Sequence, residues 1–155
     1  MITDANPPET AGSRPPAANP ATRRVFSGTT WEPVVGYSRA VAAGDFVFVS
    51  GCTSVDGAEL AHPGDAYAQT RQAIGNAAAG LAGLGASLAD VVQTRMYVTD
   101  ISRWQEYGRA HGEAFAQVRP AATMVQVAAL IDPGMLIEIE VVAYRRGIGQ
   151  DRSDA

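Results

Sequence analysis

The sequence predicts an α+β domain in which one β-sheet carries two helices on a single face. Two segments have apolar residues at steps of three and four, which is typical of amphipathic helices. Several others alternate apolar and polar residues as strands do, and turn-forming residues separate them. The 155 residues, 46% of them hydrophobic, suffice for one domain with a proper core. The expected order is strand, strand, helix, strand, helix, strand, strand, and residues 23–28 are a candidate for one more strand.

The first half of the domain combines a hairpin with a helix. The runs YSRAV and FVFVSG are rich in β-branched and aromatic residues, and Gly44 and Asp45 supply turn chemistry between them. Residues 65–84 predict the first helix, because two glycines end a helical repeat of apolar residues. That repeat consists of Tyr67, Ile74, Ala78, Leu81 and Leu84.

The second half adds a strand, a helix and two further strands. VVQTRMYVTD predicts a strand, and Ser102 with Gln105 has the spacing of a capping box at the start of the second helix. Pro120 prevents that helix from continuing. ATMVQVAAL and MLIEIEVVAY then predict two strands on either side of the turn signal DPG. One face of the second helix holds Trp104, Tyr107, His111, Phe115 and Val118.

Strand alternation predicts that the two faces of the sheet differ. An apolar set suits the space under the helices and comprises Ile137, Ile139, Val141, Val125, Val127, Val92, Met96 and Val98. The opposite set mixes apolar side chains with charges of both signs and comprises Glu138, Glu140, Val142, Tyr144, Met124, Gln126, Gln93, Arg95 and Tyr97. A face of this kind favours a subunit interface with polar pockets over full solvation.

The composition bounds the domain and excludes several kinds of function. Residues 1–22 hold five of the nine prolines and are expected to form a disordered tail. Residues 23–146 are expected to form the folded domain, and residues 147–155 a flexible C-terminal tail.

A net charge of −4 disfavours general binding to nucleic acid or membrane surfaces. All twelve basic residues are arginine, which excludes chemistry that depends on a lysine. One cysteine and two histidines cannot complete a zinc site of the Cys/His kind. No apolar segment is long enough to span a bilayer and no signal peptide is recognisable, so a cytoplasmic location is expected.

Several stretches, in order, resemble the RidA (YjgF/YER057c/UK114) family of reactive-intermediate deaminases. They are GYSRAV, VFVSG, AQTRQAIGN, VVQTRMYVTDI, RPAATMVQV and IEIEVVA, and together they cover nearly all of the folded body. The resemblance implies a chorismate-mutase-like fold with a six-stranded mixed sheet and two helices on one face. It also implies a homotrimer whose sheets form a central barrel, with a small-molecule site in each intersubunit cleft and no cofactor or metal.

The resemblance further implies roles for particular residues. Glu138 matches the glutamate that positions or activates the hydrolytic water, and Tyr37 matches a tyrosine that lines the cleft from a neighbouring subunit. The backbone at Gly51 and Met124 matches strand ends that face the substrate. The position after Pro-Ala, where deaminating members carry an arginine that binds the substrate carboxylate, is Ala122 in this chain. A methyl group cannot replace a bidentate guanidinium, so the chain is expected to belong to a divergent subgroup.

Two arginines are candidates to supply the missing positive charge. Arg95 shares strand parity with Tyr97, whose counterpart lines the family's cleft, but it could equally pair with Glu138 or Glu140. Arg39 is the second candidate and could instead lie at a solvated strand edge. Glu138 itself has two open interpretations, as a base for water or as a structural ion-pair partner.

Cys52 follows Gly51 at a place that the family uses for the pocket wall. Its thiol could act as a nucleophile if a cation lowered its pKa, or it could be a small buried hydrophobic residue.

Three hypotheses about function follow. The first is a RidA-like trimer that binds a small carboxylate or carbonyl metabolite and hydrolyses an imine or enamine to a keto compound and ammonia. The second is a trimer that binds a small molecule without catalysis. The third, endoribonuclease activity, is disfavoured by the acidic charge and by the lack of a histidine pair suited to acid-base cleavage.

Overall fold

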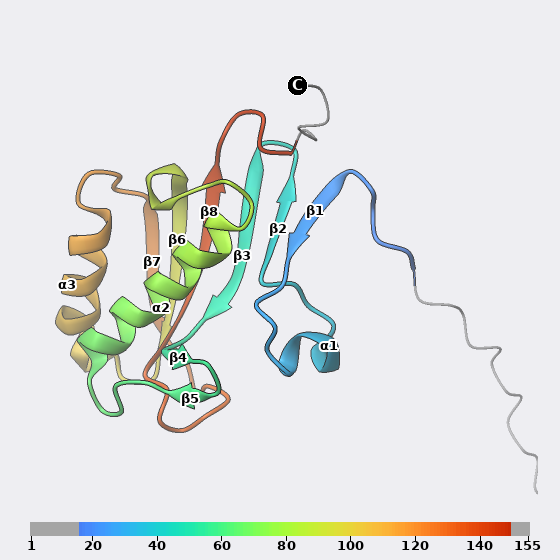
Figure 1. The fold of residues 1–155 in the computed structure, drawn as a ribbon. Coiled ribbons are helices and arrows are strands. Elements are labelled where there is room, and N and C mark those ends of the chain that lie inside the picture. The colour runs from blue at the N-terminus through green and yellow to red at the C-terminus, as the bar shows by residue number, and fades with distance from the viewer. Residues whose placement is uncertain (1–15, 150–155) are drawn as a thin grey trace, which may run out of the picture.

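The structure, a computed structural model, describes residues 16–149. Six strands form one mixed sheet in the order β1-β2-β3-β8-β6-β7, in which β6 and β7 run parallel and the other neighbours run antiparallel (Figure 1). The strands are β1 Thr22–Val25, β2 Ala40–Ala43, β3 Phe46–Cys52, β6 Val91–Val98, β7 Ala121–Gln126 and β8 Ile137–Tyr144. The candidate strand at residues 23–28 is therefore present as β1. A separate two-stranded ribbon pairs β4 Val55–Asp56 with β5 Glu59–Leu60.

Two long helices cover the same face of the sheet, as the sequence predicts (Figure 1). They are α2 Ala66–Ala82 and α3 Trp104–Phe115. A short helix that the sequence did not suggest, α1 Trp31–Val35, follows β1. Two turns of 3-10 helix precede β6 and α3, at Leu88–Asp90 and Ile101–Arg103. The α+β class and the arrangement of two helices on one face are confirmed.

The hydrophobic core lies between the helices and the sheet. Strands β3 and β8 alternate buried and more exposed positions along most of their length, which is the two-residue period of a sheet with one covered face. The largest fully buried side chains include Tyr107 and Phe115 from α3 and Leu81 from α2. Of the residues expected under the helices, Ile137, Ile139, Val141, Met96 and Val98 are buried there.

The predicted faces were wrong for Val92 and for strand β7. The pairing of β6 with β8 shifts register between Val91 and Gln93, and this bulge leaves Val92 exposed while Thr94 is fully buried. In β7 the register pairs Met124 with the buried Met96, so Met124 packs against the core and Val125 is exposed. A shift of one residue exchanges the faces of a strand, which is why alternation alone misplaced Met124, Gln126 and Val125.

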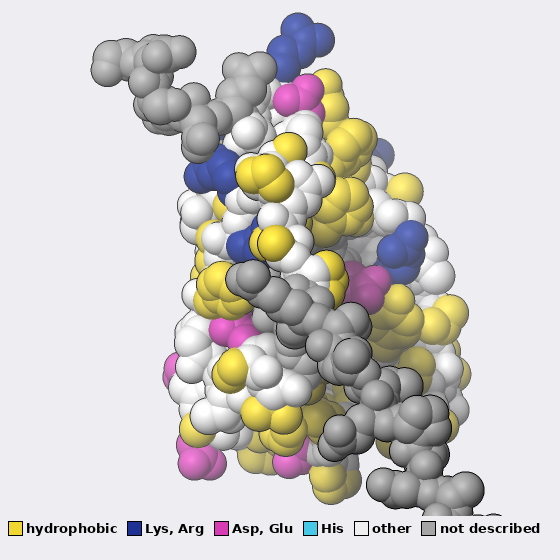
Figure 2. All heavy atoms as spheres, turned by 90° about the vertical axis from the view of Figure 1, so that its right-hand side faces the viewer, with side chains coloured by type: hydrophobic (Ala, Val, Ile, Leu, Met, Phe, Trp, Pro, Cys, Tyr) yellow, Lys and Arg dark blue, Asp and Glu magenta, His cyan; other side chains and the backbone are white. Residues whose placement is uncertain are grey.

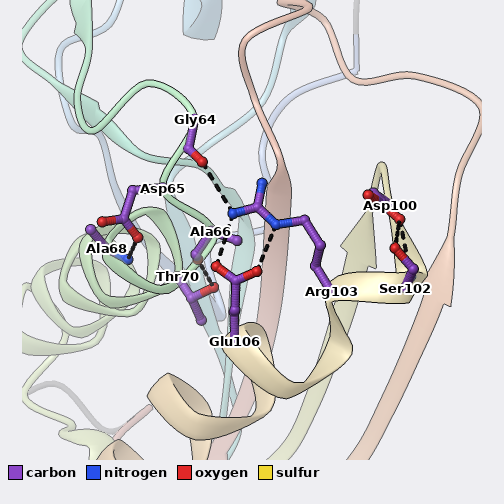
Figure 3. A network of polar contacts seen from close by, with 9 residues as sticks. All are labelled: Gly64, Asp65, Ala66, Ala68, Thr70, Asp100, Ser102, Arg103 and Glu106. Carbon is purple, nitrogen blue, oxygen red and sulfur yellow. Dashed lines mark hydrogen bonds and ion pairs between the residues drawn. The ribbon is translucent and has the colours of Figure 1, made fainter.

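The start of α3 is built differently from the predicted capping box. The side chain of Asp100 accepts hydrogen bonds from the backbone N–H and the hydroxyl of Ser102, at 3.0 and 2.6 Å, and the α-helix proper begins at Trp104 (Figure 3). Arg103 then joins the two helices, because it donates to Glu106 in α3 and to the carbonyl of Gly64 just before α2 (Figure 3). The Ser102 and Gln105 prediction is therefore wrong: Asp100 caps the 3-10 turn that precedes α3, and α3 itself has no side-chain cap.

Packed structure extends past residue 146, where a flexible tail was expected to begin. Ile148 is buried in the core, its carbonyl accepts a hydrogen bond from Arg23, and the N–H of Gly147 donates to Asp45. Most of the predicted N-terminal tail (residues 1–15) and the last part of the C-terminal one (150–155) lie outside the described residues. Within residues 16–149, no helix combines the length and apolarity that crossing a bilayer requires.

Candidate active site

Glu138 and Gly51 form the centre of the candidate site. The pairing of β3 with β8 is irregular between Val49 and Cys52, so Gly51 lies in a distorted part of its strand. The side chain of Glu138 folds over Gly51 so closely that a Cβ there would lie 2.6 Å from its Cδ and 2.9 Å from its Cγ, in collision with the carboxylate. Glycine is therefore needed at position 51 to make space for this carboxylate.

The carboxylate of Glu138 has unusual surroundings for a half-buried acid. Within the described part of the chain it has no hydrogen-bonding or ion-pair partner. Burial and the nearby charge of Glu140 raise the pKa of Glu138 above its ordinary value, and Arg39 partly opposes this. A carboxylate with a raised pKa and free lone pairs is suited to accept a proton from water.

Arg39 is drawn into the same site, although a solvated strand edge was one of its expected places. Its Nη1 donates to the carbonyl of Gly51 at 2.8 Å and to the sulfur of Cys52 at 3.2 Å. Its Nη2 donates to the hydroxyl of Tyr37 at 3.2 Å. The guanidinium thus connects β3 with the loop before β2, and it brings Tyr37, Gly51 and Cys52 together around one cation.

Cys52 belongs to the core side of this group. Only 2% of the residue is exposed, and burial raises the pKa of its thiol even though Arg39 acts in the opposite direction. The thiol also donates to the carbonyl of Ser50 at 3.3 Å. Of the two alternatives for Cys52, this geometry supports a small buried residue with a protonated thiol. It gives no support to a nucleophilic thiolate.

Arg95 and Tyr97 form a second group on the helix-free face. In the register of β6 and β8, Arg95 lies beside Glu140 and Tyr97 beside Glu138. Glu140 accepts a hydrogen bond from the hydroxyl of Tyr97 at 3.2 Å and forms an ion pair with Arg95 at 3.6 Å. Burial and Glu140 raise the pKa of Tyr97. Of the two alternatives for Arg95, the structure shows the ion pair with Glu140.

Ala122 and Met124 lie apart from Glu138 within one chain. They are on edge strand β7, which is separated from β8 by β6, and neighbouring strands are about 4.8 Å apart. Ala122 pairs with Thr94 and Met124 with Met96, both on the helix face, whereas Glu138 points to the opposite face. One chain therefore does not bring all the predicted site residues together.

A hollow of about 590 Å³ opens beside Tyr37, lined by Phe26, Gly28, Thr29, Glu32, Pro33, Gly36, Tyr37 and Ser38. Its carboxylate, Glu32, is buried and accepts hydrogen bonds from Ser27 and Gly28. Burial by itself would raise the pKa of Glu32, but these hydrogen bonds and Arg39 bring it below its ordinary value. This carboxylate is therefore already satisfied by its hydrogen bonds, and the hollow does not include Glu138. Figure 2 shows the side of the molecule that carries β1 and α1, where patches of hydrophobic side chains lie among uncharged polar ones and the charged side chains are scattered, most of them toward the rim.

Comparisons with known proteins show the family and support the fold. The family model for endoribonuclease L-PSP, the YjgF/RidA family, matches residues 28–145. The chain belongs to this family. A solved structure of a YjgF/YER057c/UK114 family member from Mycobacterium tuberculosis is 50% identical, with a TM-score of 0.73 over 79% of this chain and 98% of that one. An uncharacterized protein of Streptomyces coelicolor is 42% identical over 83% of this chain and 96% of its own length. A 3-aminoacrylate deaminase, RutC, of Acinetobacter baylyi is 35% identical over 72% of this chain and 89% of its own length.

Sequence reasoning missed how central Arg39 is. It stands just before a four-residue strand, where a solvated position was a reasonable alternative, and its partners come from the far end of β3. It also missed the bond between Thr94 and His111, at 2.9 Å, because the bulge in β6 decides that Thr94 faces the helices. Within residues 16–149 no group of three or more histidine, cysteine, aspartate or glutamate side chains is arranged to hold a metal ion.

Proposed function

We propose that this protein hydrolyses the imine or enamine form of a small carboxylate-bearing or carbonyl metabolite, releasing a keto compound and ammonia. The observation that carries the proposal is Glu138, a half-buried carboxylate with a raised pKa, held over Gly51 and within the electrostatic reach of Arg39. Membership of a family that includes a 3-aminoacrylate deaminase supports the same reaction class.

The proposed chemistry needs water as its only co-reactant. Glu138 takes a proton from water as the oxygen attacks the carbon of the protonated imine, and the C=N bond becomes a single bond to an uncharged amine. Glu138 then gives its proton to the amine nitrogen, and the resulting carbinolamine collapses as the carboxylate of Glu138 takes the hydroxyl proton. The C–N bond breaks with its electron pair on nitrogen, and ammonia departs. An enamine first takes a proton on carbon to become the imine.

The proposed site lies between subunits of a homotrimer. Two features support this assembly. The helix-free face exposes an aromatic group in which Phe46 lies 6.3 Å from Phe48 and 5.1 Å from Tyr144, measured between ring centroids. Ala122 and Met124 lie on the far edge strand and face away from Glu138, so a second copy would have to bring that edge to the site.

A second candidate function, ligand binding without turnover, is favoured by one observation. Ala122 stands where the resemblance implies the arginine that binds the substrate carboxylate, which would place this chain in a divergent subgroup. Each charge-assisted hydrogen bond of such an arginine is worth roughly 1.5 to 3 kcal/mol, so its loss could leave a site that binds weakly and does not turn over.

Ammonia release distinguishes the two functions. Freshly generated 2-iminopropanoate and 3-aminoacrylate are each mixed with the protein, and ammonia is followed over time against a protein-free control. An enzyme accelerates the release in proportion to protein concentration. Unchanged release from both compounds, together with measurable binding of pyruvate, would exclude the hydrolase and leave the binder. The mass in dilute solution tests the trimer separately.

A further inference from the structure

The structure distinguishes between the two arginines that could replace the missing cation. Arg95 is already paired with Glu140, and 48% of its side chain is exposed. Arg39 has no carboxylate within 4.0 Å among the described residues, and it is partly buried. A partly buried guanidinium without a counter-ion favours an anionic ligand, because such a ligand would offset the cost of burying the charge.

Arg39 is also held in one position. Its Nη1 and Nη2 are directed by Gly51, Cys52 and Tyr37, and its Cγ lies 3.4 Å from the place that a Cβ would take at Gly80 on α2. Gly80 therefore gives the stem of Arg39 room to pass between sheet and helix. A guanidinium fixed in this way loses little side-chain entropy when it binds a ligand.

The hydrogen bonds that Arg39 makes within the protein leave the Nε and Nη2 edge of its guanidinium available. Nη1 donates to the carbonyls of Gly51 and Ser50 and to the sulfur of Cys52, and Nη2 uses one hydrogen on Tyr37. The Nε–H and the second hydrogen of Nη2 have no partner within residues 16–149. A carboxylate takes two parallel hydrogen bonds from a guanidinium edge of this kind.

We infer that Arg39 binds the carboxylate of the substrate through this edge, in place of the arginine that is absent at Ala122, and so makes the site selective for small 2-imino and 2-keto monocarboxylates. This inference rests on the proposed function only for the imine or keto group of the substrate. The binding of its carboxylate is argued from Arg39 alone. Glu138 packs on Gly51, whose carbonyl Arg39 also binds, so the carboxylate and the reacting carbon would be held by adjoining groups.

The test compares a charged ligand with a neutral one of the same shape. Pyruvate and pyruvamide are titrated into the full-length protein by calorimetry. We expect the wild type to bind pyruvate at least about tenfold more tightly than pyruvamide, which corresponds to about 1.4 kcal/mol. Arg39→Gln should remove this preference. The matched control Arg95→Gln should keep it within about twofold.

Several outcomes would overturn the inference. They are a wild type without the preference, an Arg39→Gln variant that retains it, or an Arg95→Gln variant that loses it. Should Arg39→Gln fail to fold, the Nε–H resonance of Arg39 in the wild type gives the answer: it should move on addition of pyruvate and stay in place with pyruvamide. A resonance that pyruvate leaves unmoved would contradict the inference.

Turnover separates this inference from the proposed function. Glu138→Gln should abolish ammonia release and keep the preference for pyruvate. A wild type that prefers pyruvate through Arg39 but does not accelerate ammonia release would refute the hydrolase and leave the role of Arg39 intact. If the wild type accelerates ammonia release and Arg39→Gln still prefers pyruvate, the role of Arg39 is refuted and the hydrolase function remains.

Discussion

Glu138 and Glu140 lie two residues apart on one face of β8, yet their surroundings differ. Glu140 has an arginine and a tyrosine hydroxyl as partners, both from β6. Glu138 has neither, and it folds over Gly51 beside a cation that is bound to other groups. The pair shows how one strand can carry both a paired and an unpaired carboxylate, because the cross-strand neighbours decide which one remains free.

Removing each carboxylate in turn should give the largest contrast between the two glutamates. Glu138→Gln keeps the shape of the side chain but removes the base, so hydrolysis should fall by about 10²- to 10⁴-fold. Glu140→Gln should lower the rate by less than about tenfold. Ammonia release under identical conditions measures both. Equal losses in the two variants would mean that the glutamates do not have separate roles.

Filling the space under Glu138 should also disturb the site. In Gly51→Ala the new methyl collides with the Glu138 carboxylate, which has to move. We expect at least a tenfold loss of activity, but a change of less than about 1 kcal/mol in the free energy of unfolding, because the far end of the flexible Glu138 side chain can rotate away. Gly75→Ala is the matched control, because nothing lies within 4 Å of the new methyl and the site is inside helix α2, where alanine should stabilise by about 0.5 to 1 kcal/mol. Activity assays and chemical denaturation measure these effects, and full activity in Gly51→Ala would show that Glu138 need not stay where it is.

The pH dependence should reveal the coupling between the two carboxylates. Glu138 must be ionised to act as a base, so the rate should fall as the pH drops through its raised pKa. Glu140→Gln removes a negative charge that contributes to this shift, and it also frees the positive charge of Arg95. Both changes lower the pKa of Glu138, so the acid limb of the pH–rate profile should move to lower pH. A movement to higher pH would contradict the assignment.

The smallest effect should come from the ion pair itself. Arg95 and Glu140 are 48% and 39% exposed in their side chains, and ion pairs this open to solvent contribute little. Arg95→Ala should therefore change the free energy of unfolding of a single chain by no more than about 0.5 kcal/mol, measured by denaturant titration. A loss above about 2 kcal/mol would contradict this prediction, because it would mean that water does not reach the pair.

Regular elements with strong local signals were predictable. The hairpin of β2 and β3, helix α2 and strand β8 were found where turn residues and hydrophobic repeats place them. Errors arose where a register changed. The bulge beside Val92 and the parallel pairing of β7 depend on which strands become neighbours, and neither leaves a mark in the local sequence.

The candidate site was likewise predictable in part from the sequence and in part only from the arrangement of the strands. Glu138 and Gly51 could be selected from the resemblance, but the need for glycine under that carboxylate became visible only when β3 and β8 were placed side by side. Likewise, the preference for Arg39 over Arg95 depends on Glu140 lying opposite Arg95 and on Tyr37, Gly51 and Cys52 meeting around Arg39.

By itself, the sequence determined the class of fold, the helix-covered side of β8 and the presence of two glutamates on the other side, because side-chain alternation along a strand is a local property. The tertiary structure decided which glutamate is free, which arginine is unpaired and why residue 51 has no side chain. Those outcomes depend on contacts between strands that are far apart in the chain, and such contacts exist only once the sheet has formed.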